Sequence, residues 1–153
     1  MAVPHADSAG NGIGRVLPTV IVHRMKRDHR SLAAAVVDVW NGDSPDRIRD
    51  LLAPDYTGHM LHVQEGERDA TTYAGTIERF QAANPDTEFR IVEQFDTGDR
   101  VVTRLEARRP GPAAGGPVVS RGINISRFDA AGLLAEEWAI WSGWLDDRPT
   151  LAR

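Results

Sequence analysis

Apolar side chains in the first half of the chain recur with the period of an amphipathic helix. Their spacing predicts three helices, over about residues 31–40, 44–53 and 69–83. Each segment ends at or just before an Asn-Gly, Ala-Pro or Asn-Pro pair, and such pairs terminate helices. The first half of the sequence is therefore expected to be mainly helical.

The second half alternates between apolar and polar residues, which is the period of a β-strand. Four strands are predicted, over about residues 89–95, 101–108, 118–128 and 133–144, separated by turn-forming residues. Helices followed by an antiparallel meander indicate an α+β fold.

The last predicted strand carries two carboxylates directly before a run rich in tryptophan. Alternation along this strand places six residues on one face, namely Leu134, Glu136, Trp138, Ile140, Ser142 and Trp144. A face that combines large aromatic rings with one carboxylate and one hydroxyl is typical of an apolar pocket with a few polar groups. The alternative is that Glu136 and Glu137 are solvated and that the tryptophans belong only to the core.

Composition restricts the classes of function. The length of 153 residues favours one domain, which we place at residues 29–147 between an extension, 1–28, and a tail, 148–153. The net charge of −4 argues against a nucleic-acid partner. The absence of cysteine excludes disulfides and thiolate nucleophiles. No apolar run has membrane-spanning length and no signal peptide is evident, so we expect a cytoplasmic protein without a membrane partner.

Three segments, in this order, resemble a known family. They are VVDVWNGDSPDRIRDLLAPDYTGHM at 36–60, NPDTEFRIVEQFDTGDRVVTRLEA at 84–107 and GINISRFDAAGLLAEEW at 122–138. Their sequence and spacing resemble the SnoaL-like polyketide cyclases of the nuclear transport factor 2-like (NTF2-like) superfamily. The resemblance implies a cone in which N-terminal helices pack on a curved, mostly antiparallel sheet that encloses a cavity.

The resemblance also implies a homodimer, because this superfamily commonly pairs through the open face of its sheet. The face of the last strand that could form such a surface carries Ala135, Glu137, Ala139 and Trp141.

The family includes aldol cyclases, epoxide-opening cyclases and hydrolases, isomerases and non-catalytic binding modules. Its cyclases use an aspartate four residues after the tryptophan of the closing strand as acid and base. In this chain that position, four residues after Trp138, is Ser142. A serine hydroxyl cannot hold a mobile proton at neutral pH as a carboxyl group can. Either the acid/base role has moved to another residue or the reaction differs.

We predict three catalytic residues. Glu136 is expected to replace the missing aspartate, because it shares a face with Trp138 and Ser142; the alternative is an exposed carboxylate or one paired with an arginine. Asn124 should lie opposite Trp138 if the hairpin closes tightly, with its amide near Glu136. His59 matches the family histidine near the cavity mouth and could carry protons. Structural hydrogen bonding is the alternative for Asn124 and His59.

A second group of residues is expected to bind substrate. It consists of Trp40, Tyr56, His62, Arg104, Trp138, Ser142 and Trp144. Core packing is the alternative for the tryptophans, and pairing with a glutamate is the alternative for Arg104. His59 and His62 form an H-x-x-H pair with Glu65 three residues further on, but the segment is not clearly helical, so no metal is predicted.

Together these features predict a cofactor-independent cyclase or isomerase of secondary metabolism, in a pathway such as antibiotic biosynthesis. Its substrate would be an apolar polyketide-like or terpenoid-like molecule, converted by acid/base catalysis in the cavity. The sequence contains no Gly-rich dinucleotide motif and no P-loop, so no cofactor is expected. The alternatives are an epoxide hydrolase or epoxide-opening cyclase, and a non-catalytic binding or assembly module.

Overall fold

The computed structural model describes residues 28–61, 67–112 and 116–146. The elements of these residues are α1 (His29–Trp40), η1 (Pro45–Arg47), α2 (Ile48–Leu51), β1 (Leu52–Met60), β2 (Glu67–Asp69), α3 (Ala70–Ala83), β3 (Glu88–Asp96), β4 (Arg100–Arg109), β5 (Val118–Phe128), β6 (Leu134–Trp141) and β7 (Leu145–Asp146). Residues 1–27 of the predicted extension (1–28) and the predicted tail at 148–153 lie outside the described residues, so these boundaries stay predictions.

Short polar side chains define where the two long helices begin. The Asp28 carboxylate accepts a hydrogen bond from Arg30 N at the start of α1. Asp69 and Thr72 form a reciprocal capping box at the start of α3. The first and third predicted helices are confirmed. The second is shorter than predicted, a 3₁₀ turn (η1) followed by one α-helical turn (α2).

The strands form one curved, mixed sheet in the order β2-β1-β6-β5-β4-β3, with β7 paired to β5. All neighbouring strands are antiparallel except β1 and β6, which are parallel. The four strands predicted from alternation are confirmed as β3, β4, β5 and β6, although the last ends at Trp141, three residues earlier than expected. The sheet also contains β1, β2 and β7, which the sequence pattern did not predict.

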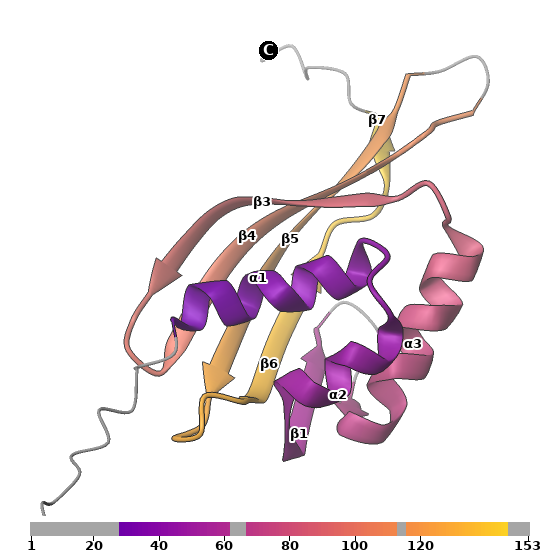
Figure 1. Ribbon diagram of the computed structural model, residues 1–153. Coiled ribbons are helices and arrows are strands. Elements are labelled where there is room, and N and C mark those ends of the chain that lie inside the picture. The colour runs from indigo at the N-terminus through magenta and orange to yellow at the C-terminus, as the bar shows by residue number, and fades with distance from the viewer. Residues whose placement is uncertain (1–27, 62–66, 113–115, 147–153) are drawn as a thin grey trace, which may run out of the picture.

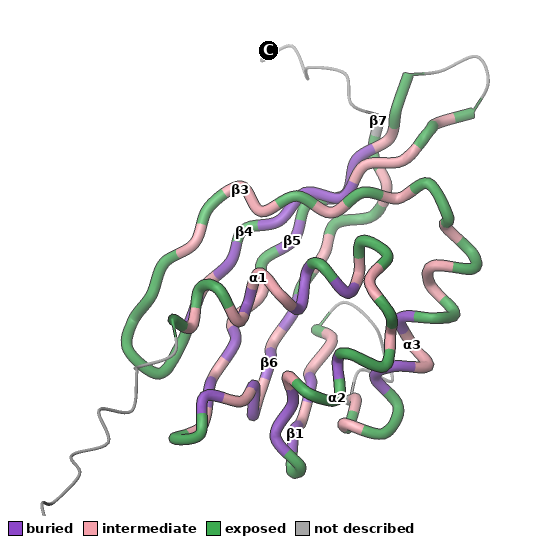
Figure 2. The backbone as a smooth tube through the Cα atoms, viewed as in Figure 1, coloured by how far each residue is buried: buried purple, intermediate pink, exposed green. Residues whose placement is uncertain are grey.

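The helices cover one face of the sheet. Figure 1 shows α1 lying across the sheet and α3 beside it, and the contacts place α1 against β3 and β4 and α3 against β1. The core lies in this layer, where Val39, Ile48 and Ile77 are fully buried. In Figure 2 the buried backbone follows the central strands and the inner sides of the helices. This arrangement confirms the predicted α+β fold with helices on a curved sheet.

A bulge between β5 and β6 determines which residues of β6 point inward. Phe128 pairs with Leu134, but the next residue of β5, Arg127, pairs with Glu136. One residue of β6, Ala135, is therefore extra in the ladder. An extra residue in one strand exchanges the two faces of that strand beyond the bulge.

Candidate active site

A cavity of about 690 Å³ lies between the helices and the inner face of the sheet. This volume is within the range of small-molecule sites. Small side chains on the central strands leave the space open, including Ala107, Ser120, Ser126 and Ala139. The cavity therefore exists because the inner face of the sheet carries few large residues.

One end of the cavity is aromatic. Trp40 lies 5.3 Å from Phe80 and 5.7 Å from Phe89, measured between ring centroids. Trp141 meets Phe89 edge to face at 5.6 Å. Trp144 also lines the cavity, and the guanidinium carbon of Arg109 lies 4.2 Å from the centroid of its ring. Such an arrangement of rings favours a flat or extended apolar ligand.

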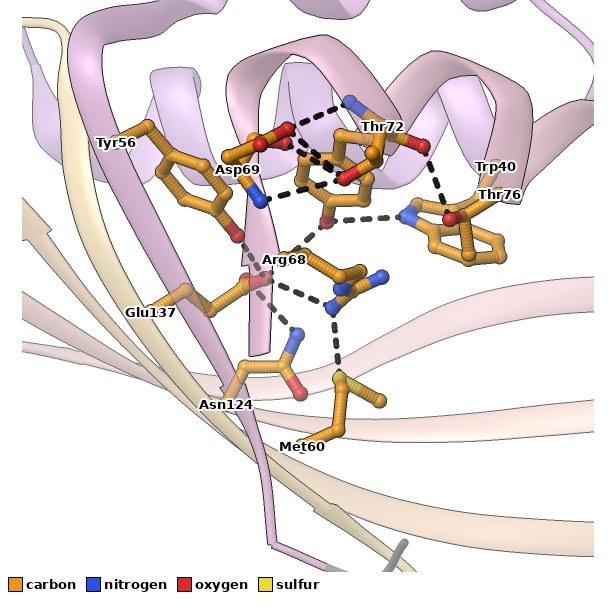
Figure 3. Close-up of polar contacts among 10 residues, drawn as sticks. Trp40, Tyr56, Met60, Arg68, Asp69, Thr72, Thr76, Asn124 and Glu137 are labelled. Atoms are coloured by element: carbon orange, nitrogen blue, oxygen red, sulfur yellow. Dashed lines mark hydrogen bonds and ion pairs between the residues drawn. The ribbon is translucent and has the colours of Figure 1, made fainter. Parts of the chain in front are cut away.

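The other end of the cavity is polar and is centred on Glu137, which is 2% exposed. Its Oε2 accepts hydrogen bonds from Tyr73 Oη at 3.1 Å and Tyr56 Oη at 3.4 Å, while its Oε1 accepts one from Asn124 Nδ2 at 3.1 Å. Arg68 completes the group, with Nη2 at 3.8 Å from Oε2. Figure 3 shows the side chains of Tyr56 from β1, Arg68 from β2 and Asn124 from β5 converging on Glu137 of β6. Tyr73 reaches the same carboxylate from α3. The carboxyl group is thus buried but contacted by four polar side chains.

Burial is the main influence on the proton affinity of this group. It raises the pKa of the Glu137 carboxyl above its ordinary value, against the opposing effects of Arg68, Tyr73, Asn124 and Tyr56. Burial and the Glu137 charge also raise the pKa values of the Tyr56 and Tyr73 phenols. Both tyrosines therefore stay protonated and donate hydrogen bonds to the carboxylate, while Tyr73 Oη also accepts one from Trp40 Nε1 at 3.4 Å.

Arg68 is held in place by several contacts. Its guanidinium carbon lies 4.3 Å from the centroid of the Tyr73 ring, and its Nη2 contacts Met60 Sδ at 2.7 Å. Burial acts to lower the pKa of Arg68, but Tyr73, Glu137 and Tyr56 outweigh it and the pKa is raised. The guanidinium is therefore a permanent positive charge beside Glu137.

The expectation that the Glu136 face of the last strand lines the cavity is wrong. Because of the bulge at Ala135, Asn124 pairs with Ala139 instead of Trp138, and Glu137 lies on its side of the sheet. Asn124 does line the cavity, as predicted, but its amide donates to Glu137 and not to Glu136.

Glu136 and His59 lie together on the outer face of the sheet. His59 Nε2 is 3.1 Å from Glu136 Oε1, and its ring stacks on Trp138 with the centroids 5.4 Å apart. Arg127 donates from Nε and Nη2 to Glu136 Oε2 at 3.1 and 3.0 Å. Burial opposes these contacts, but hydrogen bonds from His59 and Arg127 hold the pKa of Glu136 below its ordinary value. This carboxylate is an ion-pair partner on a surface that the cavity does not reach.

Of the predicted substrate contacts, the structure places Trp40, Ser142 and Trp144 in the cavity lining. Tyr56 contacts Glu137 from β1. Trp138 lies on the outer face, stacked on His59. Arg104 is also on the outer face, 3.3 Å from Glu93. His62 lies outside the described residues.

Ser142, which replaces the family aspartate, has a structural contact. Its Oγ accepts a hydrogen bond from Arg121 N at 2.9 Å and donates one to Gly143 O at 3.0 Å. Its hydroxyl is thus bonded to the backbone where β6 ends. Ser142 therefore holds the backbone together just after the last residue of β6, and it supplies no titratable group there.

The surface predicted for dimerisation is also corrected. Ala135, Glu137 and Ala139 are buried toward the helices, and Trp141 lines the cavity. The uncovered face is the opposite one, where Phe95, Ile123 and Ile140 are about half exposed.

Sequence reasoning missed Arg68, Tyr73 and the role of Glu137. Tyr73 lies within the third predicted helix, for which the sequence indicated only packing, and Arg68 precedes that helix in a segment without a predicted strand. A usable signal was the small residues on either side of Glu137, since Ala135 and Ala139 leave room for a cavity where Trp138 and Ile140 would fill it.

The structure also bears on metal binding and on membrane-spanning helices. In the described parts of the chain, no three His, Cys, Asp or Glu side chains are grouped as metal ligands. No helix in those parts is long and apolar enough to cross a bilayer.

Comparison with solved structures gives several similar proteins. IdmH from Streptomyces antibioticus, a proposed polyketide cyclase, is 25% identical with a TM-score of 0.64, over 75% of this chain and 92% of that chain. A loop-truncation variant of IdmH is 28% identical with the same TM-score, over 75% and 93% of the two chains. A proposed polyketide cyclase from Acidithiobacillus ferrooxidans is 25% identical with a TM-score of 0.57, over 77% and 90%.

A comparison with curated proteins gave no match. The model of the SnoaL-like domain family matches residues 33–137, which is more than half of the sequence. The cavity, the curved sheet and this match lead to one assignment: the chain belongs to the SnoaL-like domain family.

Proposed function

We propose that this protein is a cofactor-independent cyclase or isomerase of a polyketide-like small molecule, and that Glu137 transfers the proton. The SnoaL-like family and the similarity to proposed polyketide cyclases support the class of reaction. The aromatic end of the cavity supports a largely apolar substrate.

The observation that carries the proposal is a buried carboxyl group on the wall of a ligand-sized cavity. Glu137 is 2% exposed, and burial raises its pKa toward the pH range in which a carboxyl group both accepts and returns protons efficiently. A solvated glutamate at an ordinary pKa is a weaker base and a poor acid at neutral pH. The missing aspartate is thus replaced by a glutamate five residues before Ser142.

The two oxygens of Glu137 are not equivalent. Oε2 receives both tyrosine hydroxyls and faces Arg68, whereas Oε1 receives a single hydrogen bond, from Asn124. Because Oε1 has a lone pair left, it is the atom suited to take a proton from a carbon beside a carbonyl. The bonding electrons then move to the carbonyl oxygen as an enolate, and the protonated Glu137 returns its proton to the product.

A single carboxyl group must both remove the proton from the substrate and return it to the product. Among the described residues that line the cavity, Glu137 is the only aspartate or glutamate. Hydrolysis of an epoxide requires one group to activate water and another to protonate the epoxide oxygen. A single carboxyl group suits proton removal and return at one substrate better than that reaction.

We also propose that the protein is a homodimer formed through the outer face of the sheet. Phe95, Ile123 and Ile140 are 52%, 45% and 49% exposed on this face. No described helix covers them, since α1 and α3 lie on the opposite side (Figure 1). Ile123 and Ile140 are direct neighbours across β5 and β6, and exposed apolar neighbours of this kind mark contact surfaces on soluble proteins.

The catalytic proposal is tested without the native substrate by proton exchange. The bicyclic ketone 1-tetralone has exchangeable protons beside its carbonyl, and NMR in D₂O follows their replacement by deuterium. We expect the wild type to accelerate exchange and Glu137→Gln to slow it by about a hundredfold or more, as loss of an acid/base does. The matched control is Glu136→Gln, which alters the neighbouring carboxylate on the other face. Equal exchange rates for wild type and Glu137→Gln would refute the assignment.

A further inference from the structure

Two buried polar atoms at the polar end of the cavity have no hydrogen-bond partner. They are Arg68 Nε, a donor, and Asn124 Oδ1, an acceptor. Both residues line the cavity. The third unpartnered atom among the described residues, Thr87 Oγ1, belongs to a residue outside the cavity lining. The unmet hydrogen-bonding capacity is therefore concentrated where a ligand would lie.

The orientation of each side chain is fixed by its other atoms. Asn124 Nδ2 donates to Glu137 Oε1, so a carboxylate holds the amide with its oxygen turned away. Arg68 Nη2 is held between Met60 Sδ and Glu137 Oε2, and the guanidinium lies over Tyr73. Neither atom can be satisfied by a local rotation without breaking one of these contacts. Buried donors and acceptors are normally paired, so these two require a partner from outside the chain.

The charges at this end indicate a neutral partner. The positive charge of Arg68 is already opposed by Glu137, whose Oε2 lies 3.8 Å from Arg68 Nη2. An anionic ligand group would lie beside a buried carboxylate and be repelled by it. A ketone oxygen satisfies Arg68 Nε and a hydroxyl satisfies Asn124 Oδ1, with no net charge added.

We propose that Arg68 and Asn124 recognise a hydroxy ketone. The ketone oxygen accepts the hydrogen bond from Arg68 Nε, the hydroxyl donates to Asn124 Oδ1, and the carbon skeleton extends toward Trp40 and Phe89. This inference rests on the proposed function in one respect, that the cavity binds a small molecule. It adds the polar pattern that the substrate must carry.

The test compares three bicyclic probes of nearly equal size. They are 4-hydroxy-1-tetralone, which carries both groups, 1-tetralone, which lacks the hydroxyl, and 1-tetralol, which lacks the ketone. NMR titration measures their dissociation constants for the wild type. We expect 4-hydroxy-1-tetralone to bind about tenfold more tightly than either of the others, the effect of one buried hydrogen bond. Equal binding of all three probes would overturn the proposal, because the two atoms would then be satisfied by water.

Two variants assign each contact to its residue. In Asn124→Ala the preference for 4-hydroxy-1-tetralone over 1-tetralone should disappear, while its preference over 1-tetralol should remain. Arg68→Lys keeps the positive charge but loses the Nε–H. In this variant the preference for 4-hydroxy-1-tetralone over 1-tetralol should disappear, while its preference over 1-tetralone should remain. Arg127→Lys is the matched control, because Arg127 pairs with Glu136 on the outer face and does not line the cavity, and it should keep both preferences. Loss of both preferences in every folded variant would contradict the assignment.

Failure of the proposed hydroxy-ketone recognition can be distinguished from failure of the proposed catalytic role of Glu137. If the probes show both preferences but deuterium exchange does not depend on Glu137, the recognition stands and the catalytic role falls. If exchange depends on Glu137 and the probes bind equally, only the recognition falls. Should either variant fail to fold, the comparison of probes on the wild type still decides the proposal.

Discussion

Glu136 and Glu137 are consecutive in β6, and their carboxylates lie on opposite faces of the sheet. The first is a quarter exposed and paired with His59 and Arg127, while the second is buried at the polar end of the cavity. Folding lowers the pKa of Glu136 and raises that of Glu137. Two adjacent residues of the same type therefore have opposite electrostatic roles.

These shifts predict opposite effects of pH on stability. The contribution of Glu137 is present below the pKa of the unfolded chain and is lost as pH rises through the folded pKa. The contribution of Glu136 is present above the pKa of the unfolded chain and is lost as pH falls through the folded pKa. As pH rises toward the ordinary pKa of a glutamate, the wild type should gain stability relative to Glu136→Gln. As pH rises above that ordinary pKa, it should lose stability relative to Glu137→Gln. Urea unfolding at several pH values measures both differences, and the same sign for the two variants would contradict the prediction.

Removal of the positive charge beside Glu137 should destabilise the protein most at high pH. Arg68→Met keeps much of the side-chain volume but leaves an ionised, buried carboxylate without an opposite charge. We expect a loss of about 3 kcal/mol in the free energy of unfolding at pH 8, because breaking a buried ion pair strands the remaining charge. The loss should shrink as pH falls, since Glu137 can then take up a proton. A loss that does not change with pH would show that Arg68 acts through packing alone.

The size of the aromatic end should depend on Gly122. A Cβ added at this position would overlap the Trp141 ring, so Gly122→Ala must displace that indole. We expect a loss of about 1–3 kcal/mol in stability, as overpacking generally causes, together with weaker binding of 1-tetralone. Gly116→Ala is the matched control, because a Cβ there meets no atom within 4 Å. Similar urea midpoints for the two variants would refute this role of Gly122.

The proposed dimer surface is tested by introducing a charged side chain on it. Ile140→Glu puts a carboxylate among the exposed apolar residues of the outer face, and we expect it to convert the dimer into a monomer in light scattering. Arg49→Glu changes the charge of α2, on the helical side of the molecule, and should leave the assembly unchanged. A monomeric wild type at micromolar concentration would disprove the dimer itself.

Most of the fold was predictable because its signals are local. The helical spacing of apolar residues over 31–40 marked α1, and alternation marked β4 and β5 with nearly their observed limits. By contrast, β1 was missed because its partner, β6, lies about eighty residues further along the chain. The Ala53-Pro54 pair was interpreted only as the end of a helix. In the structure Pro54 occupies the irregular stretch between Leu52 and Thr57, where β1 makes no regular ladder with β6.

The candidate site was only partly predictable for the same reason. The closing strand, Asn124 and two of the aromatic lining residues, Trp40 and Trp144, were identified from the sequence. The choice between Glu136 and Glu137 depended on one extra residue. Alternation gives the two faces of a strand without saying which of them points inward. A tight hairpin and a bulged hairpin give opposite answers. Ala135 and its two neighbours, Leu134 and Glu136, include no glycine or proline that would mark the bulge itself.

The bulge at Ala135 also bears on how readily such a cavity can be gained or lost in evolution. Without the extra residue, the inward positions of β6 would be those of Glu136, Trp138 and Ile140, whose large side chains would occupy the space that Ala139 leaves open. A deletion of one codon would thus exchange a hollow interior for a packed one and would move a different carboxylate inward. Insertion and deletion of single residues in closing hairpins offer a short route between binding domains and purely structural ones on the same scaffold.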